Sequence, residues 1–321
     1  MNSQKIQAVV DGRWPQVDVA STRHLAAAGL ESRLVKKATD DGALLRLRRG
    51  AYVRRGYWDS LKPWDQDLLR VLAHFESTGG DSRYSHISAA RLHRCNVWEV
   101  GPLIHVTTGY SNSRASAGKD VRTHRLPLAD HELASVRTTD GREVLTTSLE
   151  RTVLDCARIL PLDRAAVIGD HALRKGASLE RMRQLLDESP TKRGSRRAAD
   201  LLEVIDGRSE SAGETRTRLL LRSFGLDSFI PQVEIPTGQG LFRADFADLQ
   251  ARVIIEFDGR AKYSDYKPAE EALLSERWRE TALQELGWSV FRIKWPQLDR
   301  PGELRRRLFA FLATQKRPWP A

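Results

Sequence analysis

The pattern of apolar and polar positions divides the chain into regions with different periodicity. Near the N-terminus, apolar residues recur at helical spacing and a short β pattern follows over residues 43–53. Residues 61–185 mix helical repeats with short apolar runs. Residues 209–316 open with a helical pattern that leads into two strand-like runs. The pattern therefore predicts an α/β (α+β) chain with several domains.

Residues 1–60 are predicted to form a DNA-binding domain. Two helical patterns, the first capped by Ser21 or Thr22 and the second over residues 31–39, precede a basic hairpin that turns at Gly50. Helix, helix and basic hairpin is the order of a winged helix-turn-helix, whose second helix enters the major groove while the wing contacts phosphates. The wing residues proposed to bind DNA are Arg46, Arg48 and Arg49. An ordinary solvated hairpin is the alternative.

Residues 61–185 are predicted to form a middle α/β module. A helix is expected over residues 68–75 and strands over 103–107 and 121–126, and a strand at 144–147 leads into a helix over 148–159. Residues 186–208 are basic and include a helix that ends near Gly207, which suggests a linker or docking segment. Its basic residues include Lys192, Arg193, Arg196 and Arg197.

Composition narrows the class of protein. The 321 residues include 40% hydrophobic and 29% charged residues, with no apolar run long enough to span a membrane and no signal-peptide core, so a cytoplasmic protein is expected. The two cysteines, Cys95 and Cys156, stand alone and suggest neither a disulfide nor a zinc site. A net charge of +10 favours a polyanionic partner, for which we expect DNA, with RNA and a homodimer left open.

Three stretches carry the candidate chemistry, at residues 209–214, 242–246 and 253–259. Taken as a hairpin with its turn at residues 248–251, the last two pair Ala247 with Arg252. That register puts Asp245 across from Ile254 and beside Glu256 on one face, with Phe242, Ala244 and Phe246 together on the other face. The spacing therefore permits a cluster of carboxylates.

Such a cluster suits phosphodiester hydrolysis, which uses a hard divalent cation to neutralise the phosphate and activate water. Mg²⁺ or Mn²⁺ would take carboxylate oxygens from Asp245 and Glu256, with Glu214 assisting from the preceding helix. Glu214 also has a structural interpretation, because Ser211-x-x-Glu214 matches a capping box.

These stretches together resemble a known family. The pattern Ser-Glu-Ser-x-x-Glu, then Asp-Phe, then Ile-Glu-Phe-Asp-Gly, followed by a charged helix ending at Gly287-Trp288 and a strand over residues 290–295, is similar to a very-short-patch-repair-like endonuclease domain of the PD-(D/E)XK superfamily. The resemblance covers about residues 209–298 and implies a restriction-endonuclease-like fold that cleaves DNA. The catalytic residues it implies are Glu214, Asp245, Glu256, Asp258 and Lys262.

One position departs from that family's motif. Asp258 stands where the motif has lysine, two residues after Glu256. Lys262, four residues further on, is the expected substitute that orients water or stabilises charge on the phosphate.

The first half of the chain has a second resemblance. Residues 18–60, with Arg48-Arg49-Gly50-Ala51-Tyr52, resemble the winged-helix domain of AbiEi-family antitoxins, and residues 85–175, with Thr147 to Thr152 and Asp155, resemble the segment after it. This implies a DNA-binding regulator of a toxin–antitoxin system.

Two functions therefore compete. The first is a metal-dependent DNA endonuclease with an N-terminal DNA-binding domain, and the second is a non-enzymatic, antitoxin-like DNA-binding regulator whose nuclease fold is inactive. The missing motif lysine favours the regulator, and the three retained acids favour the enzyme. Most of the histidines lack metal-ligand spacing and are assigned no role; they are His86, His93, His105, His124, His131 and His171.

Overall fold

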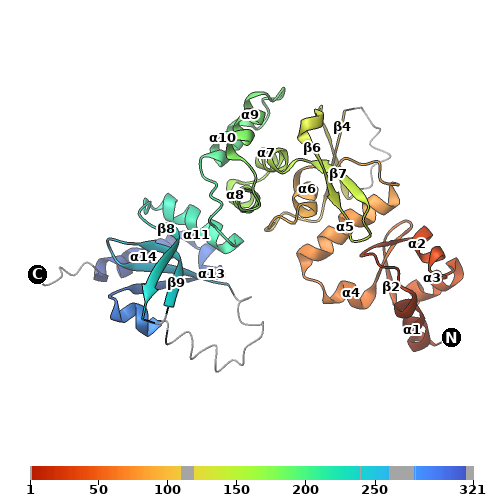
Figure 1. Ribbon diagram of the computed structural model, residues 1–321, viewed down its shortest axis with the longest axis horizontal. Helices are drawn as coiled ribbons and strands as arrows, with labels where there is room; N and C mark the ends of the chain where they lie inside the picture. The colour runs from red at the N-terminus through yellow and green to blue at the C-terminus, as the bar shows by residue number, and fades with distance from the viewer. Residues whose placement is uncertain (1, 110–118, 239, 260–277, 279, 316–321) are drawn as a thin grey trace, which may run out of the picture. The chain divides into compact units, whose positions relative to one another are not determined.

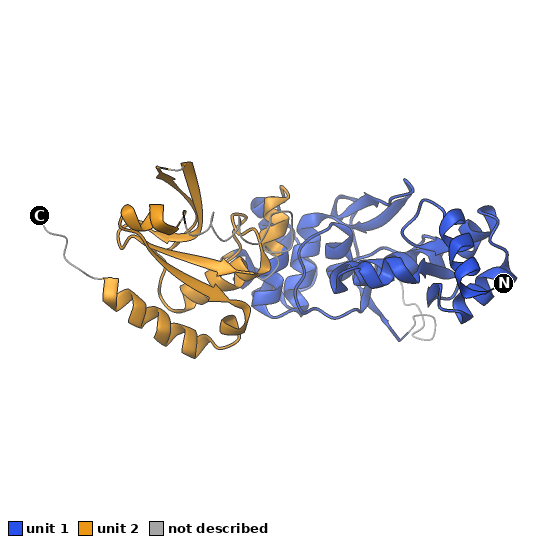
Figure 2. Cartoon of the chain, turned by 90° about the horizontal axis from the view of Figure 1, so that it is seen from below, with its two compact units in different colours: residues 1–168, 177–202 blue, residues 169–176, 203–321 orange. Residues whose placement is uncertain are grey.

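The computed structural model describes residues 2–109, 119–238, 240–259, 278 and 280–315 (Figure 1). The chain is of mixed α/β class and separates into two compact units (Figure 2). Unit 1 comprises residues 1–168 and 177–202, and unit 2 comprises residues 169–176 and 203–321. In the described parts of the chain, no helix combines the length and hydropathy that crossing a membrane requires.

Unit 1 begins with a small helical group on a short sheet. Its elements are α1 (Ser3–Arg13), β1 (Ala20–Ser21), α2 (Thr22–Ala27), α3 (Ser32–Asp40), β2 (Leu44–Arg48) and β3 (Ala51–Arg54). The three strands are ordered β1-β3-β2 among the described residues, and Gly50 makes the β2–β3 turn with a left-handed φ of 77°. Ile6, Leu25 and Leu44 are fully buried in the core beneath these elements. The helices and the hairpin follow the predicted order, whereas α1 was not predicted.

The rest of unit 1 packs helices around two short strand pairs. Its helices are α4 (Arg55–Ser60), α5 (Pro63–Ser77), α6 (His86–Leu92), α7 (Leu149–Ile159), the first part of α8 (Leu162–Arg174), α9 (Leu179–Asp187) and α10 (Ser195–Leu202). The strands are β4 (Ile104–Thr108), parallel to β5 (Val121–Arg125), and β6 (Leu133–Arg137), antiparallel to β7 (Glu143–Thr147). One core joins β3, α5, β4 and β7 through Val53, Leu69, Ile104 and Val144.

Unit 2 is built on a mixed sheet. Its elements are α11 (Ala212–Ser223), β8 (Ile230–Thr237), β9 (Gly240–Asp248), β10 (Val253–Asp258), β11 (Ser289–Lys294), α13 (Trp295–Leu298) and α14 (Pro301–Gln315). Within the described residues the sheet has the order β11-β10-β9-β8, in which β8, β9 and β10 are antiparallel and β11 runs parallel to β10. Leu221 of α11 and Leu308 of α14 are buried against Ile255 on one face of this sheet. That covered face positions α11 beside the strands that carry the acidic residues.

Candidate functional site

Asp245 and Glu256 lie across from each other on β9 and β10. The ladder pairs Ile255 with Phe246 and Ile254 with Ala247, which brings Asp245 opposite Glu256. The predicted pairing of Ala247 with Arg252 is therefore wrong by two residues. The turn has the predicted length of four residues but lies one residue further along the chain, at 249–252, where Asp248 accepts the amides of Gln250 and Ala251 at 3.0 and 2.9 Å. Because the error is an even number of residues, the two acids stay together.

The two acids are fixed by reciprocal hydrogen bonds where the β9–β10 ladder ends. The backbone amide of Phe257 donates to Asp245 Oδ2 at 2.8 Å, and the amide of Asp245 donates to Glu256 Oε1 at 3.1 Å. Asp245 is buried, with 7% of its surface exposed. Carboxylates thus take the positions that backbone carbonyls fill in a continuous ladder, and they separate the two strands at this point.

The strand alternation breaks at Asp245. Ala244 packs with Ile254, whereas Phe246 packs with Ile255 in the cluster on the other face. The prediction that Phe242, Ala244 and Phe246 share one face is therefore wrong. Gln232 of β8 lies opposite Asp245 in the register and has a left-handed φ of 55°, so both neighbouring strands are irregular here.

Glu214 is connected to the strands that carry Asp245 and Glu256 by a hydrogen bond from Gln232. Its Oε2 accepts from Gln232 Nε2 at 2.9 Å and from the amide of Glu210 at 2.8 Å, and its Oε1 accepts from the Ser211 hydroxyl at 2.8 Å. Ser211 Oγ in turn accepts the Glu214 amide at 3.2 Å as the N-cap of α11. Glu214 is therefore a buried capping residue that also holds Gln232. Gln232 was not predicted from the sequence, because no sequence pattern identifies a glutamine whose backbone is in the left-handed region.

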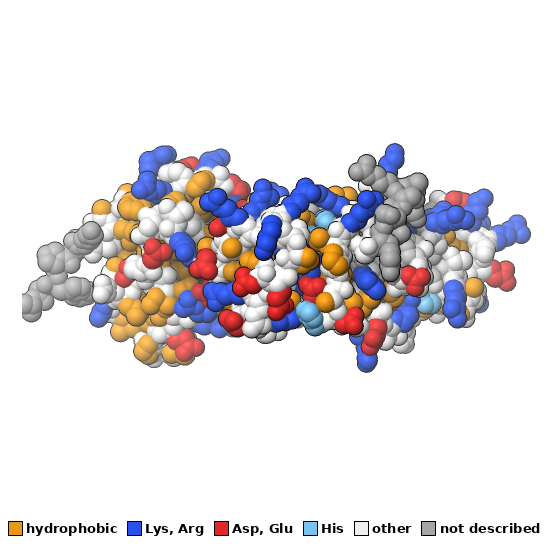
Figure 3. Space-filling view, turned by 90° about the horizontal axis from the view of Figure 1, so that it is seen from above, with side chains coloured by type: hydrophobic (Ala, Val, Ile, Leu, Met, Phe, Trp, Pro, Cys, Tyr) orange, Lys and Arg blue, Asp and Glu red, His pale blue; other side chains and the backbone are white. Residues whose placement is uncertain are grey.

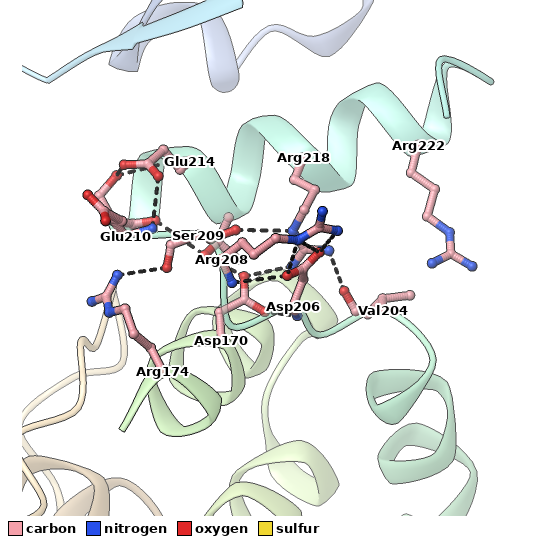
Figure 4. Close-up of polar contacts among 12 residues, drawn as sticks. Asp170, Arg174, Val204, Asp206, Arg208, Ser209, Glu210, Glu214, Arg218 and Arg222 are labelled. Carbon is pink, nitrogen blue, oxygen red and sulfur yellow. Dashed lines mark hydrogen bonds and ion pairs between the residues drawn. The ribbon is translucent and has the colours of Figure 1, made fainter. Parts of the chain in front are cut away.

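The base of α11 is held by a buried ion pair (Figure 4). Arg218 donates to Asp170 Oδ2 at 2.6 Å, and the Thr215 hydroxyl donates to the same oxygen at 2.8 Å. Asp170 Oδ1 accepts the amide of Asp206 at 2.7 Å. Burial raises the pKa of Asp170, and the Arg218 charge opposes that rise. These bonds fix the helix that presents Glu214.

The basic position of the predicted motif is only partly described. Lys262 lies outside the described residues. Asp258 pairs in register with Lys294 of β11, and Lys294 Nζ lies 3.9 Å from Asp258 Oδ2. The parallel strand thus brings a lysine beside the acid that stands in the motif's lysine position. Sequence reasoning missed Lys294, although the predicted strand over residues 290–295 contained it.

The predicted wing residues differ in exposure. Arg46 and Arg49 are exposed on the β2–β3 hairpin, whereas Arg48 donates to Asp120 at 2.5 Å and is mostly covered. In Figure 3, basic side chains are spread over the visible face with acidic ones between them. The charged side chains visible on that face are therefore of both signs.

Three histidines that the sequence left without a role come together in unit 1. The ligand nitrogens of His86, His105 and His124 lie within 4.8 Å of one another, which makes them the candidate metal set among the described residues. His86 stacks on His124 with ring centroids 3.6 Å apart, and His105 Nδ1 lies 2.9 Å from His124 Nε2. The carboxylates Glu214, Asp245 and Glu256 do not meet that distance criterion in the described structure. Parallel pairing of β4 with β5 brings His105 and His124 together, and His86 joins them from α6, so no spacing along the chain reveals the cluster.

The chain is similar to proteins of Mycobacterium tuberculosis. No family model matches the chain. It is 32% identical over 274 residues to two proteins of Mycobacterium tuberculosis, "Uncharacterized protein MT2308" (strain CDC 1551 / Oshkosh) and "Uncharacterized protein Rv2248" (strain ATCC 25618 / H37Rv), and each match covers 84% of this chain and 92% of the relative. The crystal structure of the RV2827C protein of M. tuberculosis overlaps 68% of this chain and 80% of that one with a TM-score of 0.41 and 16% identity, a level that does not establish a shared fold.

Proposed function

We propose that this chain, which belongs to the family of the M. tuberculosis proteins MT2308 and Rv2248, is a Mg²⁺- or Mn²⁺-dependent nuclease that hydrolyses DNA phosphodiester bonds. The observation that carries the proposal is the interlocked pair Asp245 and Glu256 at the point where β9 and β10 separate. Asp245 is buried and Glu256 is half-buried, and a carboxylate withdrawn from water is costly unless cations or donors compensate it. Two such carboxylates opposite each other at the end of a ladder favour a cationic partner.

The donor set fits a hard divalent cation. Asp245 and Glu256 supply carboxylate oxygens, the ligands that Mg²⁺ prefers. A metal bound there would supply charge neutralisation at the phosphate and an activated water. Glu214 acts as a positioning residue, because its carboxylate holds Gln232 opposite Asp245. Lys294 adds a positive charge beside Asp258 for the phosphate.

The N-terminal elements support DNA as the substrate. The order α2, α3 and the β2–β3 hairpin is that expected of a winged helix-turn-helix, with α3 for the major groove and exposed Arg46 and Arg49 for phosphates. Arg48 is engaged by Asp120, so we assign it a smaller role in phosphate contact.

Asp245→Asn should abolish cleavage of supercoiled plasmid by the full-length chain. The swap is nearly isosteric but removes one charge from the metal site, so we expect a rate loss of roughly a thousandfold or more. Wild type, Asp245→Asn and Glu256→Gln are assayed with Mg²⁺, with Mn²⁺ and with a chelator. Glu234→Gln is the matched control, because Glu234 is an exposed acid on the same sheet, and it should cleave like wild type. Equal cleavage by wild type and Asp245→Asn would remove Asp245 from the catalytic centre.

A DNA-binding regulator with an inactive nuclease fold is the second candidate. The observation that favours it is Glu214, whose two oxygens are both engaged in capping α11 and holding Gln232. Asp258 in the motif's lysine position points the same way. Wild-type protein that binds duplex DNA in a gel-shift assay but cleaves no substrate with either metal would establish this alternative.

A further inference from the structure

A cavity of about 840 Å³ lies within unit 1, between β5, the end of α7 and the segment that leads into α10. We propose that this arginine cavity binds a phosphate-bearing ligand of about nucleotide size. Among the described residues, its walls carry Arg122, Arg125, Arg158, Arg193 and Arg197. The proposal is separate from the acidic site of unit 2 and does not depend on it.

The charged side chains that line the cavity are all positive among the described residues. None of the described residues that line it is acidic, and the guanidinium groups come from three different segments of the chain. Converging positive charge in a concave surface raises the local concentration of anions, and guanidinium groups match phosphate oxygens in geometry. Its volume lies in the range of small-molecule sites.

Arg158 is the buried anchor of the cavity. Its side chain is 6% exposed, and it donates to Ser189 Oγ at 2.7 Å while Nη1 lies 3.8 Å from Asp155 Oδ1. Its Nε and Nη1 are buried and have no hydrogen-bond partner. A buried cation with unpaired donors is costly, and the charge of an anion in the cavity would stabilise it.

The backbone around Arg158 favours the same ligand. Gly194 lines the cavity with a left-handed φ of 73°, and a Cβ there would lie 2.9 Å from Arg158 Cβ, so only glycine fits this close approach. The helix α10 starts at the next residue, Ser195. Its N-terminal amides and dipole therefore begin at the cavity wall and add partial positive charge.

Two histidines of the cavity lining, His86 and His124, add polar groups without charge. Burial, together with neighbouring histidine and arginine charges, lowers the pKa of His86 well below its usual value. Burial and Arg122 lower the pKa of His124 to about 4. Neutral imidazoles are also metal ligands, but the surrounding arginines repel a bare cation. The electrostatics of the cavity therefore favour an anion.

Two probes test the cavity and identify the source of the phosphate. Inorganic pyrophosphate stands for a free phosphorylated molecule, and a short single-stranded DNA stands for a nucleic-acid phosphate. Titration calorimetry of the full-length protein at low salt should give saturable binding of at least one probe. Arg197→Gln should weaken it by about tenfold, because one charge-assisted contact is lost. Arg196→Gln is the matched control on the same helix, outside the cavity lining, and should change affinity less than twofold.

Arg158→Gln should abolish binding, and a melting curve reports whether that buried substitution still folds. Arg197 is exposed, so its variant keeps the test valid if the Arg158 variant does not fold. Asp245→Asn should bind the probe like wild type, which separates this site from the nuclease. The proposal is overturned if neither probe binds saturably, or if Arg196→Gln and Arg197→Gln weaken binding equally.

Discussion

Gly213 shows how tightly a single residue limits the packing of α11. A Cβ at this position would lie 1.9 Å from Phe257 Cε1, so the helix rests directly on the ring that follows Glu256. We predict that Gly213→Ala lowers the free energy of unfolding by about 2 kcal/mol, because an overpacked core must shift. The measurement is a denaturant titration of the full-length protein.

Gly302 provides the control for that prediction. It is the second residue of α14, as Gly213 is of α11, but a Cβ there meets nothing within 4 Å. Gly302→Ala should therefore be neutral or stabilise by about 0.5 kcal/mol. Equal effects of the two alanines would mean that Phe257 does not support α11.

The buried His74 makes unit 1 sensitive to acid. His74 Nδ1 and the Tyr84 hydroxyl form a hydrogen bond of 2.8 Å. Burial, with a smaller contribution from the Arg48 charge, lowers the pKa of His74 to about 4. The unfolded chain takes up this proton near pH 6.5, whereas the folded chain does so only near pH 4. Stability is therefore lost as the pH falls through that window, by at most about 3 kcal/mol for this residue.

The variant His74→Gln isolates this effect because glutamine does not titrate. The free energy of unfolding, measured by denaturant titration from pH 7 to pH 4, should decline less steeply in the variant than in wild type. Parallel curves would show that His74 keeps its ordinary pKa in the folded protein.

At the residue scale, the acidic residues of the candidate site could be predicted from the sequence, whereas the residues that contact them could not. The period of two along the strands brought Asp245 and Glu256 together even though the turn lies one residue further along the chain than expected. Gln232 and Lys294 depend on which strands become neighbours, and this information is not local in the sequence. The histidine cluster depends on strand pairing in the same way.

At the scale of elements, the buried ion pair beneath α11 should be essential. Asp170 receives Arg218, Thr215 and a backbone amide, and it is almost completely buried. Asp170→Asn leaves the Arg218 charge without its carboxylate, so we predict a loss of about 3 kcal/mol in the free energy of unfolding. Thermal and denaturant unfolding measure it.

The exposed Asp227, which follows α11, is the matched control. Asp227→Asn should change stability by less than about 0.5 kcal/mol. A loss of similar size in both variants would mean that the ion pair contributes nothing specific.

The elements that the sequence predicted are those with a clear period. Strands β9, β10 and β11 and helices α3, α7 and α11 fall close to their expected ranges, whereas α5 begins five residues earlier than expected. Strand β8 was missed because Pro231 and Pro236 interrupt its pattern, which an edge strand tolerates. Helix α14 was missed because few of its residues, such as Leu304 and Leu308, are buried.

At the scale of the whole molecule, DNA binding should depend on the exposed wing. The double variant Arg46→Gln and Arg49→Gln should weaken duplex binding and reduce the slope of log affinity against log salt by about 2, since each phosphate contact contributes about 0.9. Fluorescence anisotropy across a salt titration measures this slope. Arg137→Gln with Arg306→Gln removes the same charge from other exposed positions and should leave the slope unchanged.

Substitution is a better test than deletion of residues 1–60. Val53 and Trp58 belong to the same core as Leu69 of α5, so removing the N-terminal segment would expose that core. An unchanged salt slope in the double variant would exclude the wing as a DNA contact.

The division of α8 between the two units has a consequence for synthesis on the ribosome. Residues 169–176 belong to unit 2 but are made before residues 177–202, which complete unit 1. Asp170 therefore emerges well before Arg218 and Thr215, and its carboxylate stays hydrated until α11 has been translated. Domains fold largely in the order in which they are synthesised. Unit 1 can therefore form its core before Arg218 and Thr215, the partners of Asp170 in α8, have been synthesised. Unit 2 then becomes native after unit 1.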